Sequence, residues 1–254
     1  MRAARSKNLP LKGGKILSSG LLHVGVLEAV TSFNTMAYLG VREQQDLASQ
    51  AHVAVVDLTN LTSPTVLTPT QVLSATQALA TEGSRLYRLD ARGRLDIYSL
   101  AIPQSPALLG GIDVPTADSF NFSGSATRHL AVAGGIAYVS LADGVRVVDL
   151  RDLTALSLGP VFGTGIGSGQ VALTNGLLAL VGDDVNTPHS VTSIFQVYQL
   201  NAALAPTLLA QRIITSYRPP LTAADGRFVL AEGGGGAVIY ALFRQNLYLP
   251  LVTR

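Results

Sequence analysis

The sequence contains no cysteine and no tryptophan, and it has few charged residues. Without cysteine, disulfide bonds and thiolate metal sites are both excluded, and the compartment stays open because a cysteine-free chain suits an exported protein as well as an intracellular one. Charged residues make up 13% of the chain and apolar residues 48%, so the charged share is about half of that usual in soluble domains. Such a chain can bury a large core, and its surface must be rich in small and uncharged polar residues.

Long apolar runs are missing as well. The longest candidate, Leu130–Ala142, contains two glycines and falls short of the ~18 residues that span a bilayer, so we expect no transmembrane segment. The formal net charge of +2 is too small to indicate nucleic-acid binding. Five cations lie within residues 1–15, and no apolar stretch of about 7–15 residues follows them, so no signal peptide is visible. We expect residues 1–15 to form a basic, disordered N-terminal segment, the alternative being a start cut from a longer reading frame.

What the chain does contain is a repeat of five segments, each an apolar strand that closes on a leucine. The closing residues are separated by 42, 50, 50 and 42 positions and are Leu58, Leu100, Leu150, Leu200 and Leu242. Four of the segments carry a residue pair that favours a tight hairpin upstream of the leucine, at Glu82-Gly83, Gly134-Gly135, Asn175-Gly176 and Asp225-Gly226. Each repeat therefore has room for four short strands, which is the spacing of the blades of a β-propeller.

The third repeat shows the expected blade most clearly. We place its strands A to D, counted from the centre of the ring outward, at Leu130–Ala133, Ile136–Leu141, Val145–Leu150 and near Leu156–Phe162. A four-stranded unit cannot cover both of its faces alone, so several must pack around an axis. The prediction is an all-β fold, a β-propeller of five four-stranded blades in a single domain over residues 16–252. The alternatives are a β-sandwich, a β-solenoid, or a fragment of a larger ring.

These repeats resemble the LVIVD-repeat family of bacterial β-propellers. The third repeat carries the resemblance best, in Gly135-Ile-Ala-Tyr-Val139 followed by Gly144-Val-Arg-Val-Val-Asp-Leu150, and the first adds Val55-Val-Asp-Leu58. The remaining repeats match more loosely. The resemblance implies the propeller fold over residues 25–245 and a bacterial source, and it says little about activity because the motif records strands and turns.

The last residues have two interpretations. Leu247–Arg254 resembles short Tyr-Leu-Pro-Leu-Val tails with a basic residue on exported bacterial surface proteins, which implies an extracellular or cell-surface location. The other interpretation makes Leu247–Val252 the outer strand of the last blade, where Pro250 suits an edge strand.

Loop lengths indicate which end of the ring binds a partner. The A–B turns are uniformly short, whereas the B–C and D–A connections vary and must leave from the opposite end. Long polar loops on a rigid scaffold are common binding sites, and the candidates are Arg42–Gln50, Pro115–Thr127, Gly163–Gly169, Gly182–Thr192 and Thr215–Pro220. Within them we single out Asp183, Asp184 and His189, and Tyr217 and Arg218 as interface anchors.

A second set of candidates comes from strand A. Counting six residues back from each A–B glycine reaches Gln77, His129, Gln170 and Pro220. Strand residues alternate between two faces, so we expect Gln77, His129 and Gln170 to ring the mouth of the central channel. The alternative is that they form a water-filled hydrogen-bond set that only supports the fold.

Motifs for catalysis are weak. The four histidines have no metal-ligand spacing, and Gly165-Ile-Gly-Ser-Gly169 has its serine misplaced for a nucleophile elbow. We therefore expect a monomeric, non-catalytic binding or scaffold module without a cofactor, from an exported or surface bacterial protein, which binds a protein or a glycan. The alternative is a propeller hydrolase of lactonase type with a metal at the channel mouth.

Overall fold

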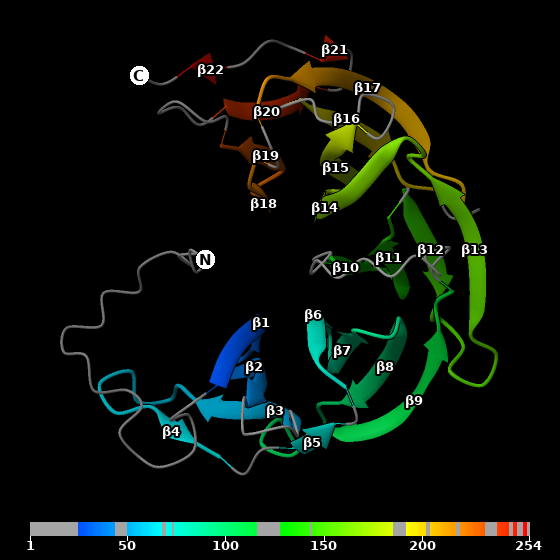
Figure 1. The fold of residues 1–254 in the computed structure, drawn as a ribbon. Coiled ribbons are helices and arrows are strands. Elements are labelled where there is room, and N and C mark those ends of the chain that lie inside the picture. The colour runs from blue at the N-terminus through cyan, green and yellow to red at the C-terminus, as the bar shows by residue number, and fades with distance from the viewer. Residues whose placement is uncertain are drawn as a thin grey trace.

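The computed structural model describes residues 25–43, 50–67, 70–72, 74–115, 128–142, 144–184, 192–201, 204–216, 219–231, 238–243, 246–247 and 251–252. These residues contain no helix, and hence none that could cross a membrane. They form five antiparallel sheets that follow one another along the chain. Figure 1 shows the sheets arranged as an arc, with the first strand of each toward its centre.

The first two sheets come from residues 25–113. Sheet 1 comprises β1 (Gly25–Phe33), β2 (Met36–Glu43), β3 (Gln50–Asp57) and an interrupted outer strand, β4 (Thr65–Val66) with β5 (Thr70–Val72). Sheet 2 comprises β6 (Thr76–Glu82), β7 (Arg85–Asp90), β8 (Arg94–Ser99) and β9 (Ala107–Asp113).

The other three sheets repeat this order. Sheet 3 comprises β10 (Leu130–Ala133), β11 (Ile136–Ser140), β12 (Val145–Asp149) and β13 (Ser157–Phe162). Sheet 4 comprises β14 (Ile166–Thr174), β15 (Leu177–Asp184), β16 (Ser193–Gln199) and β17 (Thr207–Ile214). Sheet 5 comprises β18 (Leu221–Ala224), β19 (Arg227–Leu230), β20 (Val238–Phe243) and the two short strands β21 (Asn246–Leu247) and β22 (Leu251–Val252), which both pair with β20. The strands predicted for the third repeat are confirmed to within one residue at every end.

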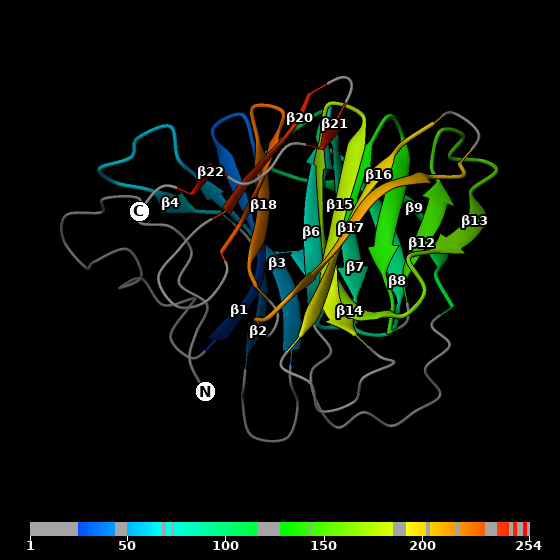
Figure 2. The same ribbon diagram turned by 90° about the horizontal axis from the view of Figure 1, so that it is seen from above.

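Two-residue turns join the first and second strands of every sheet, and Figure 2 shows these turns gathered at one end of the molecule. In sheets 3, 4 and 5 both turn residues have positive φ, as at Asn175 and Gly176, which a type I′ turn requires. In sheets 1 and 2 only the first turn residue does, at Asn34 and Gly83. We call this end the turn end, and the opposite end, from which the B–C and D–A connections leave, the loop end.

Side chains alternate between the two faces of each sheet, and each face packs against a neighbouring sheet. The face that sheet 2 turns to sheet 3 carries Tyr87 and Ile97, which pack with Val148. The face that it turns to sheet 1 carries Leu86 and Tyr98, which pack with Tyr38. Equivalent apolar clusters join sheets 3 and 4 and sheets 4 and 5. The core is therefore a series of layers between sheets.

The repeat also predicts that Val56, Ile97, Val148, Tyr198 and Tyr240 occupy equivalent or near-equivalent buried positions, and the strand register shifts one of them by a residue. Val56, Val148 and Tyr198 pair with Ala37, Ala137 and Leu178, the second residues of their B strands. The matching residue in sheet 2 is Tyr98, which pairs with Leu86, whereas the predicted Ile97 pairs with Tyr87 and faces sheet 3. The error has a physical origin: a shift of one residue along a strand moves the side chain to the other face. The fifth predicted residue, Tyr240, lies in β20, where only the backbone is described.

The two ends of the chain bear on how the arc is completed. The outer strand of sheet 5 is supplied by β21 and β22, which confirms the strand interpretation of the last residues. Because blades leave exposed edges unless the two ends of the chain meet, we predict that the N-terminal residues 15–19 pair with this sheet; they lie outside the described residues. Among the described residues no apolar cluster joins sheet 5 to sheet 1, and Figure 1 shows the arc open between them. The number of blades in the complete ring stays a prediction.

Candidate functional site

The inner strands β1, β6, β10, β14 and β18 are tied together by side chains that reach from one sheet to the next. The Gln170 carboxamide oxygen accepts a hydrogen bond from the backbone N–H of Leu221 at 3.0 Å. The Gln77 oxygen accepts a longer one, 3.5 Å, from the N–H of Arg128. At the turn end, both carboxylate oxygens of Glu82 accept from the N–H groups of Gly134 and Gly135. Two of the three predicted channel residues thus help to hold adjacent sheets together.

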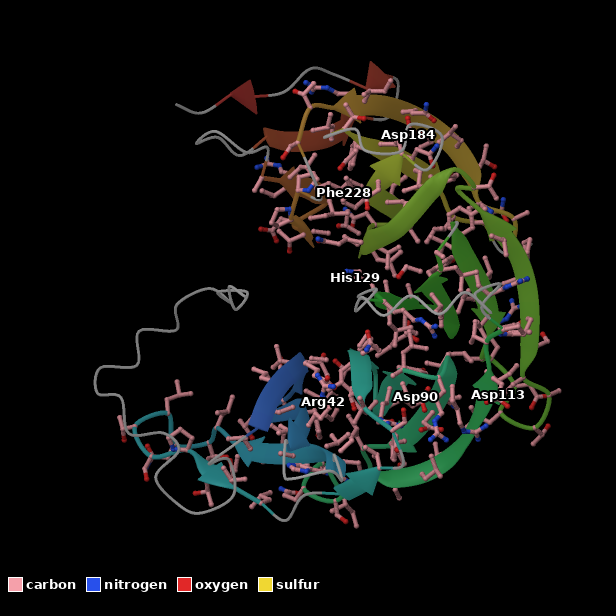
Figure 3. All side chains as sticks on the ribbon, in the orientation of Figure 1. Arg42, Asp90, Asp113, His129, Asp184 and Phe228 are labelled. Carbon is pink, nitrogen blue, oxygen red and sulfur yellow. The ribbon has the colours of Figure 1, made fainter. Side chains whose placement is uncertain are left out.

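The third predicted channel residue, His129, behaves differently. Its backbone N–H donates to the Ser140 hydroxyl at 2.6 Å, which fixes the start of β10. Its imidazole makes no hydrogen bond within the part of the chain that the structure describes. Burial lowers the pKa of His129 to about 4, so the ring is neutral at physiological pH. Figure 3 places His129 at the inner edge of the arc.

Strand register corrects the predicted alignment of the three residues. His129 and Gln170 pair with Ser140 and Val181, the fifth residues of their B strands. In sheet 2, the fifth residue of the B strand is Leu89, and it pairs with Ala78. Gln77 lies one residue earlier, in a β-bulge. The prediction counted back from Gly83, which is the first residue of its turn, whereas Gly135 and Gly176 are the second residues of theirs.

Glu28 is a residue that sequence reasoning missed. It occupies the bulge of β1 that corresponds to the bulge at Gln77. Its side chain is only 12% exposed and forms an ion pair with Arg42, with Nε 2.9 Å from Oε1. Desolvation raises the pKa of Glu28, against the lowering effects of Arg42 and of a backbone hydrogen bond from Thr76. The bulge turns this carboxylate into the layer between sheets 1 and 2.

Sheet 2 holds a buried ionic network on the face that it turns toward Glu28 and sheet 1. Arg88 is 2% exposed, and it donates to Asp96 at 2.7 Å, to the Thr76 hydroxyl at 3.0 Å and to the backbone oxygen of Ser74. Asp96 also pairs with Arg94, which reaches Asp113 at 3.2 Å. Each carboxylate of this network is neutralised by an arginine, so the network is suited to support, not to ligand binding.

The two predicted loop acids lie in a strand. Asp183 and Asp184 end β15, where they pair with Gly167 and Ile166 of β14. The predicted loops Gly163–Gly169 and Gly182–Thr192 are correspondingly shorter, because residues 166–169 and 182–184 belong to strands. Both acids remain at the loop end, on sheet 4, while Figure 3 shows Arg42, Asp90 and Asp113 on sheets 1 and 2. The structure therefore does not bring Asp183 and Asp184 together with the ionic network.

The other predicted contacts cannot be placed in the same way. His189, Tyr217 and Arg218 lie outside the described residues, as do 44–49 and 116–127 of the predicted loops. Within the described residues, no three His, Asp or Glu side chains gather closely enough to hold a metal ion. The described part of the candidate site is thus the row of Gln77, His129 and Gln170 on three successive inner strands.

Comparison with known proteins supports the fold and leaves the function open. No protein-family model matches the chain, and no curated protein matches its sequence. Among solved structures, the periplasmic gluconolactonase PpgL of Pseudomonas aeruginosa matches with a TM-score of 0.58 and 14% identity, over 84% of this chain and 66% of that one. Two computationally designed proteins also match at 12% identity: Ika8 covers 85% of this chain and 71% of its own with a TM-score of 0.49, and Ika4 covers 74% and 99% with a TM-score of 0.46.

The likeness to the lactonase, together with the sheets described above, shows that the chain is an all-β protein with a β-propeller fold. At this level of identity it shows the fold alone, because one propeller fold supports many functions. The chain spans just under two thirds of the length of that lactonase.

Proposed function

We propose that this propeller is a non-catalytic binding module of an exported or surface bacterial protein, and that it binds a glycan or a protein through its loop end. The observation that carries the proposal is the chemistry of the inner strands at that end. They present the neutral imidazole of His129, together with the amide N–H₂ groups of Gln77 and Gln170, whose oxygens are used between sheets. Amides and imidazoles bind polar groups by hydrogen bonds without requiring a reaction.

The contacts that nearby carboxylates already make within the fold favour a binding function over a hydrolase function. A lactonase-type hydrolase would need acidic or amide side chains that converge on a metal ion at the channel mouth. On the described inner strands, Glu28 is ion-paired with Arg42 and Glu82 accepts two backbone N–H groups at the turn end. Both oxygens of Glu82 and the Oε1 atom of Glu28 are therefore already used in holding adjacent strands and sheets, while Oε2 of Glu28 is buried.

The difference between the two ends supports the loop end as the binding face. The turn end is closed by five two-residue turns. At the loop end the separation between paired strands varies: β7 and β8 are three residues apart, whereas β15 ends at Asp184 and β16 begins at Ser193. A rigid scaffold with variable connections at one end is a common arrangement for recognition.

The test is binding of the labelled protein to an array of bacterial and host glycans and surface proteins. Asp184→Ala, His189→Ala, Tyr217→Ala and Arg218→Ala probe the loop end, and Ser84→Ala and Arg227→Ala are matched controls at the turn end. We expect folded variants, at least one tenfold loss of affinity among the first four, and unchanged binding in the controls. Loss only in the controls would place the site at the turn end. Hydrolysis of a sugar lactone that depends on a divalent cation and on His129 would favour the enzyme instead.

A further inference from the structure

Arg128, which precedes β10, has a guanidinium that the fold does not satisfy. Its Nη1 atom is buried and has no hydrogen-bond partner. Arg128 also forms no ion pair in the part of the chain that the structure describes. Arg146, the other partly buried arginine of this sheet, also has one buried nitrogen without a partner, Nε, but its Nη1 donates to the Gly159 carbonyl at 3.0 Å. A buried cationic donor without an acceptor is costly, because the group has lost its hydration.

The backbone around Arg128 is held firmly. Its own N–H donates to Gln77 on the preceding inner strand, and the next N–H donates to Ser140. Arg128 occupies the level of the bulged residues Glu28 and Gln77 in sheets 1 and 2, one place before the level of His129 and Gln170. The backbone that carries the guanidinium thus starts from a defined point at the loop end.

The neighbours of Arg128 are neutral and polar. His129 follows it directly and has an imidazole without a hydrogen-bond partner in the described residues. Gln77, on the preceding inner strand, uses its oxygen as the acceptor for the Arg128 N–H, which leaves its amide N–H₂ group as a donor, whereas the Gln170 side chain reaches toward sheet 5. The set is therefore rich in donors and carries a single positive charge.

We propose that the start of β10 binds the carboxylate of an acidic sugar, with Arg128 as the cation and His129 and Gln77 as neutral hydrogen-bonding neighbours. A carboxylate matches the planar guanidinium fork and brings one negative charge to balance one positive charge. A phosphate monoester is largely a dianion at neutral pH, so one arginine would leave part of its charge uncompensated. This inference rests on the proposed glycan-binding function and names the class of glycan.

The experiment measures binding by calorimetry and by thermal unfolding, with D-galacturonate as probe. Its methyl ester has nearly the same shape without the charge, and sodium acetate at equal ionic strength controls for a general anion effect. At about five times Kd, galacturonate should raise Tm by about 2–4 °C, and the methyl ester should not. Arg128→Gln should weaken galacturonate binding at least tenfold, and Arg128→Lys should weaken it less. Arg227→Gln, at the turn end, should leave it unchanged.

The other possible results show whether the carboxylate site alone fails or the proposed binding function fails with it. Equal binding of galacturonate and its methyl ester would overturn the carboxylate site, and this comparison uses the unaltered protein, so it holds even where an Arg128 variant fails to fold. Equal loss in Arg128→Gln and Arg227→Gln would overturn it as well. If neutral glycans bind and lose affinity on Asp184→Ala or Tyr217→Ala while galacturonate has no advantage, the acidic ligand is wrong and the proposed function stands. If no glycan or protein binds at the loop end, both fail.

Discussion

Buried polar residues in this propeller divide into those that the fold satisfies and those that it leaves available. Arg88 donates to three oxygens from three different residues, so its burial is compensated. Gln170 is half satisfied, because its oxygen accepts from Leu221. His129 and Arg128 have no side-chain partner in the described residues. Glu28 and Arg146 each have one unpaired buried atom as well, but both form another polar contact. Arg128 and His129 lie next to each other at the loop end, which is why the ligand proposal centres there.

The lowered pKa of His129 makes stability depend on pH in a predictable direction. The folded state resists protonation down to about pH 4, whereas the unfolded chain takes up the proton near pH 6.5. Because the unfolded state binds more protons between these values, the free energy of unfolding falls as the pH is lowered through this window. From pH 7 to pH 5 the His129 contribution should be a loss of about 2 kcal/mol.

Urea unfolding of the parent and of His129→Gln at both pH values isolates this contribution. Other titrating groups, including Glu28 with its raised pKa, act alike in the two proteins and cancel in the difference. A parent and variant that lose the same stability between pH 7 and pH 5 would show that His129 is accessible to protons in the folded state.

At the scale of strands and sheets, close packing at glycine positions determines which substitutions are tolerated. A Cβ on Gly182 of β15 would lie 2.5 Å from the Gly167 carbonyl oxygen and 2.7 Å from the Gly169 Cα, both backbone atoms of β14. A Cβ on Gly110 of β9 would meet nothing within 4 Å. Neither residue has a positive φ, so the comparison tests packing alone.

We expect Gly182→Ala to lower the free energy of unfolding by about 1–3 kcal/mol, because backbone cannot move aside as a flexible side chain does. Gly110→Ala should be neutral or raise stability by up to about 1 kcal/mol, since alanine reduces the entropy of the unfolded chain. Chemical denaturation of both variants provides the measurement. Equal effects at the two glycines would mean that β14 and β15 are not packed as described.

The layers between sheets should be equally sensitive to charge. Val148 is fully buried between sheets 2 and 3, so Val148→Asp should destabilise by about 3–5 kcal/mol, because the carboxylate would be buried without a partner. Its cross-strand neighbour Leu158 is 39% exposed, and Leu158→Asp is the matched control, expected to cost about 1 kcal/mol or less. Thermal melts distinguish the two, and similar melting temperatures would contradict the assignment of β12 to the core.

Much of the fold could be predicted because each sheet carries its own local signals. The turn pair Gly134-Gly135 and the run Val145–Leu150 fix β10 to β12 without reference to other sheets. The bulges at Glu28 and Gln77 were not predictable, since the side chain at each bulge bonds an N–H group of the following sheet, a contact between repeats that no local pattern shows. Gln77 was aligned one residue out of register with His129 and Gln170 because the count started from the turn glycine. That glycine is the first residue of the turn in sheet 2 and the second residue of the turns in sheets 3 and 4. No sequence pattern pointed to Arg128, because what distinguishes it is a buried Nη1 atom without a hydrogen-bond partner, which is visible only in the structure.

At the scale of the whole molecule, the arc raises the question of how its two end sheets are protected. Sheet 1 turns Met36 and Tyr38 toward sheet 2, so Val41 and Ala54, on the other face, point toward the opening. Both are buried, at 2% and 1% exposure. None of the five sheets packs an apolar cluster against that face in the described residues.

Removal of residues 1–24 tests the predicted role of the N-terminal segment in closing the ring. This segment leads directly into β1, at the edge of the opening, and open edges and apolar faces promote aggregation. We expect the truncated protein to melt at a lower temperature and to be less soluble than the parent, as measured by calorimetry and light scattering. Unchanged melting and solubility would mean that closure does not involve this segment.

The hydrogen bonds between inner strands have a direction that bears on how such a chain could lengthen. Gln77 of sheet 2 accepts from sheet 3, and Gln170 of sheet 4 accepts from sheet 5, so a repeat offers its acceptor forward and its N–H donor backward. A tandem duplication of one repeat within the gene would therefore insert a sheet that meets a matching donor and acceptor on its two sides.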